Sequence, residues 1–151
     1  MATIRSATEA DVDTIVKMAR HFIAFAPHAA VAEYDDEDLA NAARACMQHG
    51  LLIVAEQDGE VVGMLFGIIS SLWFARRTLW ASELAWWVEP AARGGTAGIR
   101  LVTAFQDWAR EHGAKVVAMS SLHLDHDSRV GNVLERMGFS PSEHTYIKRI
   151  S

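Results

Sequence analysis

The chain has 151 residues, with 14 Lys and Arg against 19 Asp and Glu, so its formal net charge is −5, and 50% of its residues are hydrophobic. These values are typical of one globular domain over residues 1–151, and they exclude collagen-like and disordered chains. A single cysteine, Cys46, excludes an intrachain disulfide framework, and the acidic balance argues against a general nucleic-acid-binding surface. The start of the chain lacks the apolar core of a secretory leader, and no apolar run is long enough for a membrane span, so we expect a cytoplasmic protein.

The first half of the chain predicts a strand, two helices and a hairpin. Apolar residues recur at helical spacing after Thr8, which can cap the first helix. The pair Asp58-Gly59 favours a hairpin turn, because both residues tolerate positive φ. In chain order, the predicted segments are a strand at 4–6, a helix after Thr8, a helix from Asp35 or Asp36 to Gly50, and strands at 51–55 and 61–69.

The second half of the chain predicts the remainder of a sheet around one long amphipathic helix. An apolar run follows the basic turn at residues 74–77 and is stopped by Pro90. In chain order, the predicted segments are a strand at 79–88, a helix between Gly98 and Gly113, a strand at 115–120, a helix at 128–137 and a closing strand at 144–150. The expected fold class is α/β (α+β), with a mixed, mostly antiparallel sheet flanked by helices and one parallel β-α-β crossover.

Residues 93–98 suggest an anion-binding turn between a strand and a helix. Glycines at a helix N-terminus allow unpaired backbone N–H groups to converge on a phosphate, and the helix dipole adds partial positive charge there. Arg93 can supply a forked donor to the same oxygens. No Lys-Ser or Lys-Thr pair follows the glycines, which disfavours a nucleotide-hydrolysing phosphate loop. Taken alone, the pattern also fits a tight turn that simply needs glycine.

Four segments spread over nearly the whole chain carry a family resemblance. They are Ile4-Arg5-Ser6-Ala7-Thr8 with Asp11, Val54-Ala55-Glu56 with Val62-Gly63, the run from Val88 to Gly98, and Met137-Gly138-Phe139. In these segments the chain resembles the GNAT superfamily of acetyl-CoA-dependent N-acetyltransferases, and Val88 to Gly98 looks like its coenzyme motif of Arg/Gln-x-x-Gly-x-Gly/Ala type. The resemblance implies that the pyrophosphate of acetyl-CoA is held by Arg93, Gly94, Gly95, Thr96, Ala97 and Gly98. It also implies that the Trp87-Val88 backbone bonds the pantetheine arm like an added strand.

Two residues depart from the pattern of that family. Thr96 replaces the middle glycine of the motif, and its Cβ narrows the turn unless the threonine keeps a negative φ. Leu134 stands where many members carry a tyrosine proposed to protonate the leaving thiolate. A thiol pKa near 8.5 lies only about 1.5 units above neutral pH, so the thiolate can leave with water as the proton source. We therefore expect slower turnover rather than none.

Glu83 is the candidate general base. Acetyl transfer requires a neutral amine, and a carboxylate that interrupts an apolar strand is expected to have a pKa raised by desolvation. The alternative is an outward-facing Glu83 balanced by Arg76 or Arg77. Glu89, beside the expected phosphate site, is expected to face solvent rather than to act in catalysis.

The expected function is transfer of acetyl from acetyl-CoA to a primary amine by direct attack, on a small molecule or a protein. Thr96 and Leu134 motivate a first alternative, a degenerate module that binds acyl-CoA without efficient catalysis. The run His123-Leu124-Asp125-His126-Asp127 motivates a second, a metal-dependent hydrolase, although no second ligand cluster is evident and no bound metal is expected.

Two further surface features allow more than one interpretation. The acidic run at 33–38 either attracts an amine or forms a solvated helix start, and the second interpretation is favoured because negative charge stabilises a helix N-terminus. Trp73, Phe74 and Trp80 gather around one hairpin and suit core, an acceptor pocket or the seam of a homodimer.

Overall fold

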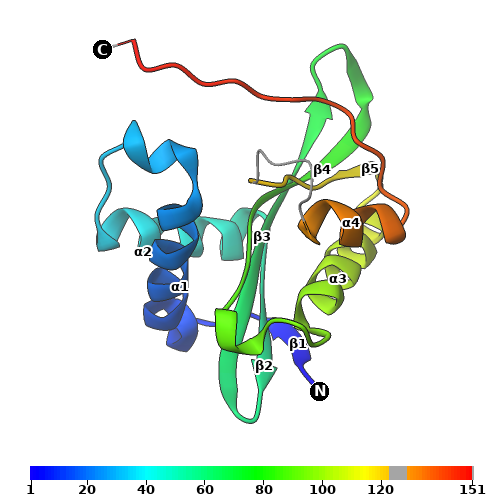
Figure 1. Cartoon of the computed structure of the whole chain (residues 1–151). Helices are drawn as coiled ribbons and strands as arrows, with labels where there is room; N and C mark the ends of the chain where they lie inside the picture. Colours follow the sequence, from blue (N-terminus) through cyan, green and yellow to red (C-terminus); the bar gives the residue numbers. More distant parts are fainter. Residues whose placement is uncertain (123–128, 151) are drawn as a thin grey trace.

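The computed structural model describes residues 1–122 and 129–150. The helices are α1 (Val12–Phe25), α2 (Asp36–His49), α3 (Ala97–Glu111) and α4 (Arg129–Arg136), with short 3₁₀ turns η1 (Glu9–Asp11), η2 (Pro27–Ala30) and η3 (Pro90–Ala92). The strands are β1 (Thr3–Ser6), β2 (Leu51–Gln57), β3 (Glu60–Leu72), β4 (Ala75–Val88) and β5 (Ala114–Ala118). Figure 1 shows α1 and α2 on one side of the sheet and α3 and α4 on the other.

The five strands form one sheet in the order β1-β2-β3-β4-β5. The first three neighbouring pairs are antiparallel, and β4 and β5 are parallel. The chain returns from β4 to β5 through α3, so the mixed sheet and the parallel crossover predicted from the sequence are confirmed.

Each face of the sheet has its own apolar core. Ile15 of α1 packs with Met64 of β3 on one face, whereas Leu101 and Phe105 of α3 pack with Leu65 on the other, and all five side chains are fully buried. Met64 and Leu65 point in opposite directions because successive side chains of a strand alternate between its faces. Helices on both faces hold β3 and β4 in the middle of the molecule.

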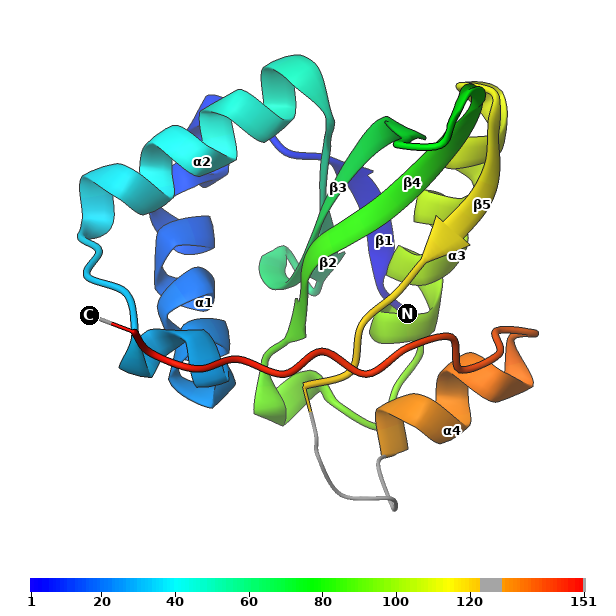
Figure 2. The ribbon, with the colours of Figure 1, turned by 90° about the horizontal axis from the view of Figure 1, so that it is seen from above.

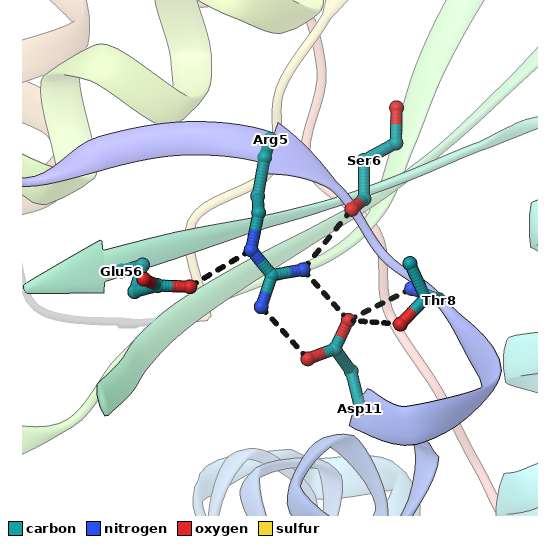
Figure 3. Close-up of polar contacts among 5 residues, drawn as sticks. All are labelled: Arg5, Ser6, Thr8, Asp11 and Glu56. Atoms are coloured by element: carbon teal, nitrogen blue, oxygen red, sulfur yellow. Dashed lines mark hydrogen bonds and ion pairs between the residues drawn. The ribbon is translucent and has the colours of Figure 1, made fainter. Parts of the chain in front are cut away.

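A charged network joins the N-terminal strand to the first helix (Figure 3). The Arg5 guanidinium donates to both carboxylate oxygens of Asp11, at 2.8 and 2.9 Å, and its Nε donates to Glu56 at 2.8 Å. The Thr8 backbone N–H donates to the same Asp11 carboxylate at 2.8 Å. The hydrogen bonds from Arg5 lower the pKa of the buried Asp11 from 3.8 to about 2. The network fixes the position at which the chain passes from β1 through η1 into α1.

The hairpin between β3 and β4 differs from the prediction in the position of its turn. The sequence predicted a basic turn at 74–77, but the turn lies at Trp73 and Phe74, and β4 already begins at Ala75. Leu72 and Ala75 form the last pair of the ladder. Arg76 and Arg77 therefore belong to the strand, where their long side chains reach solvent.

The predicted closing strand at 144–150 is not formed. Residues 140–150 are exposed throughout and run as extended chain from α4 toward the side of α1 and α2, outside the sheet (Figure 2). Tyr146 is 90% exposed and Ile150 is 91% exposed. The alternation of this segment is typical of a strand, but a strand in a sheet also needs one buried face, and every residue of this segment is exposed. None of the helices in the described part of the chain combines the length and apolar character needed to cross a bilayer.

Candidate active site

The candidate site begins where β4 and β5 stop pairing. Their ladder runs from Leu79 and Ala114 to its last pair, Ser82 with Ala118. Beyond this pair, β4 continues to Val88 and stays paired with β3 on its other side only. The second half of β4 therefore has a free edge, and a free strand edge offers backbone groups to a ligand.

A β-bulge lies at the start of this free edge. Glu83 pairs with Gly67 and Ala85 pairs with Phe66, so Leu84 between them has no partner in β3. A Cβ on Gly67 would lie 2.6 Å from Phe105 Cε2, so only glycine leaves room here for the Phe105 ring. Bulges bend a strand and redirect its side chains, and this one sets the direction of the Glu83 side chain.

The Glu83 carboxylate spans the space between the two diverging strands. Its Oε2 accepts a hydrogen bond from the Ser120 backbone N–H at 3.0 Å, just beyond the end of β5. Burial raises the pKa of Glu83 from 4.5 to about 7, and the Ser120 hydrogen bond opposes part of that rise. In the structure, the Glu83 carboxylate is half-buried and accepts a hydrogen bond from Ser120. This arrangement differs from the alternative interpretation, in which Glu83 faces outward and is balanced by Arg76 or Arg77.

The register of β4 shows which backbone groups face its free edge. The Glu89 N–H donates to the Val62 carbonyl at 2.8 Å, so these two residues form a hydrogen-bonded pair. Because hydrogen-bonded and non-hydrogen-bonded pairs alternate in an antiparallel ladder, the Val88 and Trp86 groups point away from β3 and those of Trp87 point toward it. Of Trp87 and Val88, the two residues whose backbone the resemblance pairs with the pantetheine arm, only Val88 presents its backbone groups to the free edge. Trp86 presents its groups there too, as the period-2 alternation of a strand could have indicated.

The turn into α3 has the geometry of an anion-binding site. Gly94 has a φ of +89°, which favours glycine, and the α3 N-cap residue Thr96 makes no side-chain cap hydrogen bond. The first N–H groups of every α-helix lack intrahelical partners. Because Thr96 does not cap those of α3 either, they can bind an anion. Thr96 has φ −96° and ψ −8°, an ordinary helical conformation, so its Cβ causes no backbone strain. A Cβ on Gly98 would lie 3.3 Å from the Trp86 ring, so this glycine allows close packing of α3 on β4.

Arg93 and Glu89 make contacts that the sequence did not show. The Arg93 Nε donates to the Val88 carbonyl at 2.8 Å. Glu89 was expected to face solvent, but its carboxylate is half-buried and lies 2.9 Å from His21 Nδ1 of α1. No local sequence signal pairs residues that lie 68 positions apart. A carboxylate and an imidazole therefore lie close to the turn that leads into α3.

Two other candidates have structural roles. Leu134 is 7% exposed and belongs to the core between the sheet and α3, so this position offers no hydroxyl group. Within the acidic run, Asp35 caps α2 by accepting from the Asp38 N–H, and Asp36 forms an ion pair with Arg20. These contacts bear out the favoured interpretation of the run as a helix start.

The metal-site hypothesis rested on residues 123–127, which lie outside the described residues. Among residues 1–122 and 129–150, no three His, Cys, Asp or Glu side chains are grouped so that they could hold a metal ion. No metal ligand is therefore assigned.

Residues 15–139 match the acetyltransferase (GNAT) family. The chain belongs to this family. A relative described as the uncharacterized N-acetyltransferase YhfO of Bacillus subtilis (strain 168) is 30% identical over 99 residues, which are 64% of this chain and 63% of the relative. The chain therefore covers less than two thirds of that relative's length.

Solved structures show that the whole chain has the GNAT fold. AAC(6')-Iy, in complex with the bisubstrate analogue CoA-S-monomethyl-acetylneamine, gives a TM-score of 0.77 at 18% identity, covering 100% of this chain and 99% of that one. An acetyltransferase from Clostridium acetobutylicum, crystallised with acetyl-CoA, gives a TM-score of 0.73 at 15% identity, covering 99% and 96%. At such identities the likeness establishes the fold, and the chemistry has to be argued from the residues of this chain.

Proposed function

We propose that this GNAT chain transfers the acetyl group of acetyl-CoA to a primary amine by direct attack of the amine on the thioester. The observation that carries the proposal is the position of Glu83. Its carboxylate, with a pKa raised to about 7, lies where β4 parts from β5 and begins its free edge. A base with a pKa near the working pH is well suited to take a proton from an ammonium group.

The coenzyme would lie along the free edge of β4 and end at the start of α3. The residues present fit it, because the first turn of α3 offers N–H groups without a side-chain cap and Gly94 adopts the positive φ that shapes the turn. The Val88 backbone would bond the pantetheine arm, and Arg93, Gly94, Gly95, Thr96, Ala97 and Gly98 would hold the diphosphate. Two GNAT neighbours in the fold comparison, solved with acetyl-CoA and with a CoA-containing analogue, support this choice of donor.

The energetics of the reaction make the base the most important group. An alkylammonium with a pKa near 10.4 is neutral in about one molecule in 2,500 at pH 7, a penalty of roughly 4.6 kcal/mol. Glu83, directly or through water, would accept the proton as the amine nitrogen forms its bond to the acetyl carbon. The bond from that carbon to sulfur then breaks, and the thiolate takes a proton from water. That last step costs only about 2 kcal/mol at pH 7, so it does not need a tyrosine at position 134.

The second candidate function is binding of acyl-CoA without efficient catalysis. The observation that favours it is the leucine at position 134, because this side chain has no hydroxyl group that could protonate the thiolate. The geometry of Thr96 does not favour it, because its negative φ leaves the turn unstrained.

A thiol-release assay separates the two functions. Purified protein is incubated with acetyl-CoA and a panel of amines that includes polyamines, aminoglycosides, amino acids and peptides, and free thiol is measured. Acetyl transfer predicts amine-dependent thiol release that fails in the Glu83→Gln variant. Binding of acetyl-CoA in calorimetry without thiol release for any amine would instead favour the binding module.

A further inference from the structure

The indole ring of Trp87 is covered by a cation that belongs to the chain itself. The Arg93 guanidinium carbon lies 4.5 Å from the centre of this ring, in the geometry of a cation–π contact. The same side chain is anchored by its Nε on the Val88 carbonyl, and it forms no ion pair with a carboxylate of the described residues. The Arg93 side chain is thus held by a ring face and one carbonyl, both uncharged.

The surroundings of Trp87 form an aromatic site with a carboxylate at its rim. Phe25 and Phe22 of α1 lie 5.4 and 6.5 Å from the ring, measured between ring centres, and the His21 imidazole lies 6.5 Å away. Glu89 holds that imidazole through a contact of 2.9 Å. Trp87 is 7% exposed while Phe25 is 60% exposed, so the indole ring is covered and its Phe25 neighbour faces solvent. Aromatic walls with a nearby carboxylate are the chemistry that binds organic cations.

Coenzyme binding would change which partner Arg93 prefers. In the proposed function, the diphosphate lies at the start of α3, and a guanidinium binds phosphate oxygens through charge-assisted hydrogen bonds. Those bonds are stronger than a contact with a ring face and one carbonyl. The Val88 carbonyl, which points to the free edge of β4, would also be needed by the pantetheine arm. Both effects draw Arg93 away from Trp87.

We propose that the Trp87 ring face, once Arg93 has moved to the diphosphate, binds a cationic group of the acceptor. This inference rests on the proposed function and specifies its substrate class. When Arg93 leaves, its positive charge leaves the site and the Glu89 carboxylate stays, so the potential at the ring becomes more favourable for a cation.

The distance along β4 indicates what such an acceptor looks like. Because Leu84 is the extra residue of the bulge, the ladder advances by only three pairs from Glu83 to Trp87, which corresponds to on the order of 10 Å at the usual rise of a strand. An amine that reacts beside Glu83 would need a second positive group on the order of 10 Å away to reach the Trp87 face. The favoured acceptors are therefore extended molecules with two or more cationic groups.

The test uses tetramethylammonium chloride, a cation that cannot be acetylated. It is titrated into ¹⁵N-labelled protein with and without saturating CoA, and the Trp87 indole N–H signal, identified with Trp87→Phe, reports binding. Sodium chloride at equal ionic strength is the blank. We expect the affinity for tetramethylammonium to be at least fivefold higher with CoA. The Arg93→Ala variant is expected to bind tetramethylammonium without CoA as tightly as the wild type does with CoA. Adding CoA to this variant is expected to change its affinity for tetramethylammonium less than twofold.

Arg77→Ala is the matched control, because it removes an exposed arginine from the distant end of β4. It is expected to behave as the wild type in both titrations. Wild-type protein that binds CoA by calorimetry but binds tetramethylammonium equally with and without it would overturn the coupling. A folded Arg93→Ala that shows no tetramethylammonium shift would overturn the cation site itself. If CoA produces no heat, the proposed function fails, and the Arg93→Ala titration still decides whether the ring face binds a cation.

A kinetic comparison tests the substrate class. With acetyl-CoA saturating, 1,8-diaminooctane is compared with octylamine, which has the same chain and one amine. We expect kcat/KM to be at least tenfold higher for the diamine, and Glu89→Gln to reduce this ratio severalfold. Equal values for the two amines would contradict the proposed acceptor class.

Discussion

The Glu83 carboxylate accepts the Ser120 backbone N–H at 3.0 Å and thereby links β4 to the chain beyond β5, where the two strands no longer pair. The hydrogen bond fixes the carboxylate in the space between the strands. Burial in the same place raises its pKa to about 7. The contact with Ser120 thus fixes the position of the group on which the proposed chemistry depends, and burial gives that group its raised pKa.

Replacing this carboxylate tests its role as the base. Glu83→Gln keeps an oxygen that can accept the Ser120 N–H but cannot take a proton at neutral pH. We expect the rate of acetyl transfer at pH 7.5 to fall by about 10²- to 10⁴-fold, the range typical of lost general base catalysis, with acetyl-CoA affinity unchanged. In the wild type, kcat/KM should rise with pH through an inflection at about 7, because only ionised Glu83 is a base, and the variant should lack this inflection. Unchanged kinetics would eliminate Glu83 as the base.

The same substitution should make the folded protein more stable at alkaline pH. Glu83 binds its proton more tightly in the folded chain, with a pKa of about 7 against 4.5, so its ionisation opposes folding as pH rises through this window. Gln at this position carries no charge to desolvate. We expect the free energy of unfolding of Glu83→Gln to exceed that of the wild type by roughly 1 to 3 kcal/mol at pH 8 and to converge with it near pH 4. Urea unfolding at the two pH values measures the difference, and equal stability at pH 8 would speak against a desolvated carboxylate.

The network at the N-terminal corner predicts a loss of stability in acid. The pKa of Asp11 is lowered to about 2, so its contribution is complete above about pH 4 and is lost as pH falls from 4 toward 2. Asp11→Asn should destabilise the fold at pH 7 by roughly 1 to 2 kcal/mol, a value reduced by solvent around the partly exposed Arg5. Near pH 2 the variant and the wild type should converge. Thermal unfolding at both pH values tests this, and a constant difference across pH would contradict it.

A tyrosine at position 134, where many GNAT members carry one, should not supply a catalytic hydroxyl group in this chain. Leu134 is 7% exposed and packs with Leu101 and Phe105, so a larger ring with a hydroxyl group does not fit its place. We expect Leu134→Tyr to lower the free energy of unfolding by roughly 1 to 3 kcal/mol through overpacking and to leave turnover at or below the wild-type rate. Leu134→Met, of similar volume, is the control and should change stability by less than about 1.5 kcal/mol. A tyrosine variant that is stable and faster would show that this position reaches the leaving sulfur.

Much of the fold could be predicted from the sequence because its signals are local. The helical spacing after Thr8, the Asp58-Gly59 turn and the glycine-bearing entry to α3 all predict elements that the structure contains. The prediction of a closing strand was wrong because the alternating pattern of residues 144–150 does not determine which strand they would pair with. Pairing depends on where the chain end lies relative to β5, and local pattern carries no such information.

The site was predicted in part for the same reason. Glu83 could be singled out because a charge within an apolar strand is a local anomaly, and the structure adds the Ser120 contact that the sequence could not show. The pair of His21 and Glu89 could not be predicted, because α1 and the end of β4 meet only after the whole sheet has formed. The stacking of Arg93 on Trp87 depends on the shape of the intervening turn. The cytoplasmic location and the homodimer stay predictions.

Calorimetric titration of the intact protein with acetyl-CoA tests the central claim most directly. The account predicts that one molecule binds per chain with measurable heat. Gly94→Val should weaken binding at least tenfold, because valine cannot adopt the φ of +89° without strain, while a Cβ at this position meets no other atom within 4 Å. Thr96→Gly should leave the affinity within threefold, because Thr96 already has a relaxed backbone. Absence of heat from acetyl-CoA with folded wild-type protein, or equal affinities for wild type and Gly94→Val, would contradict the account.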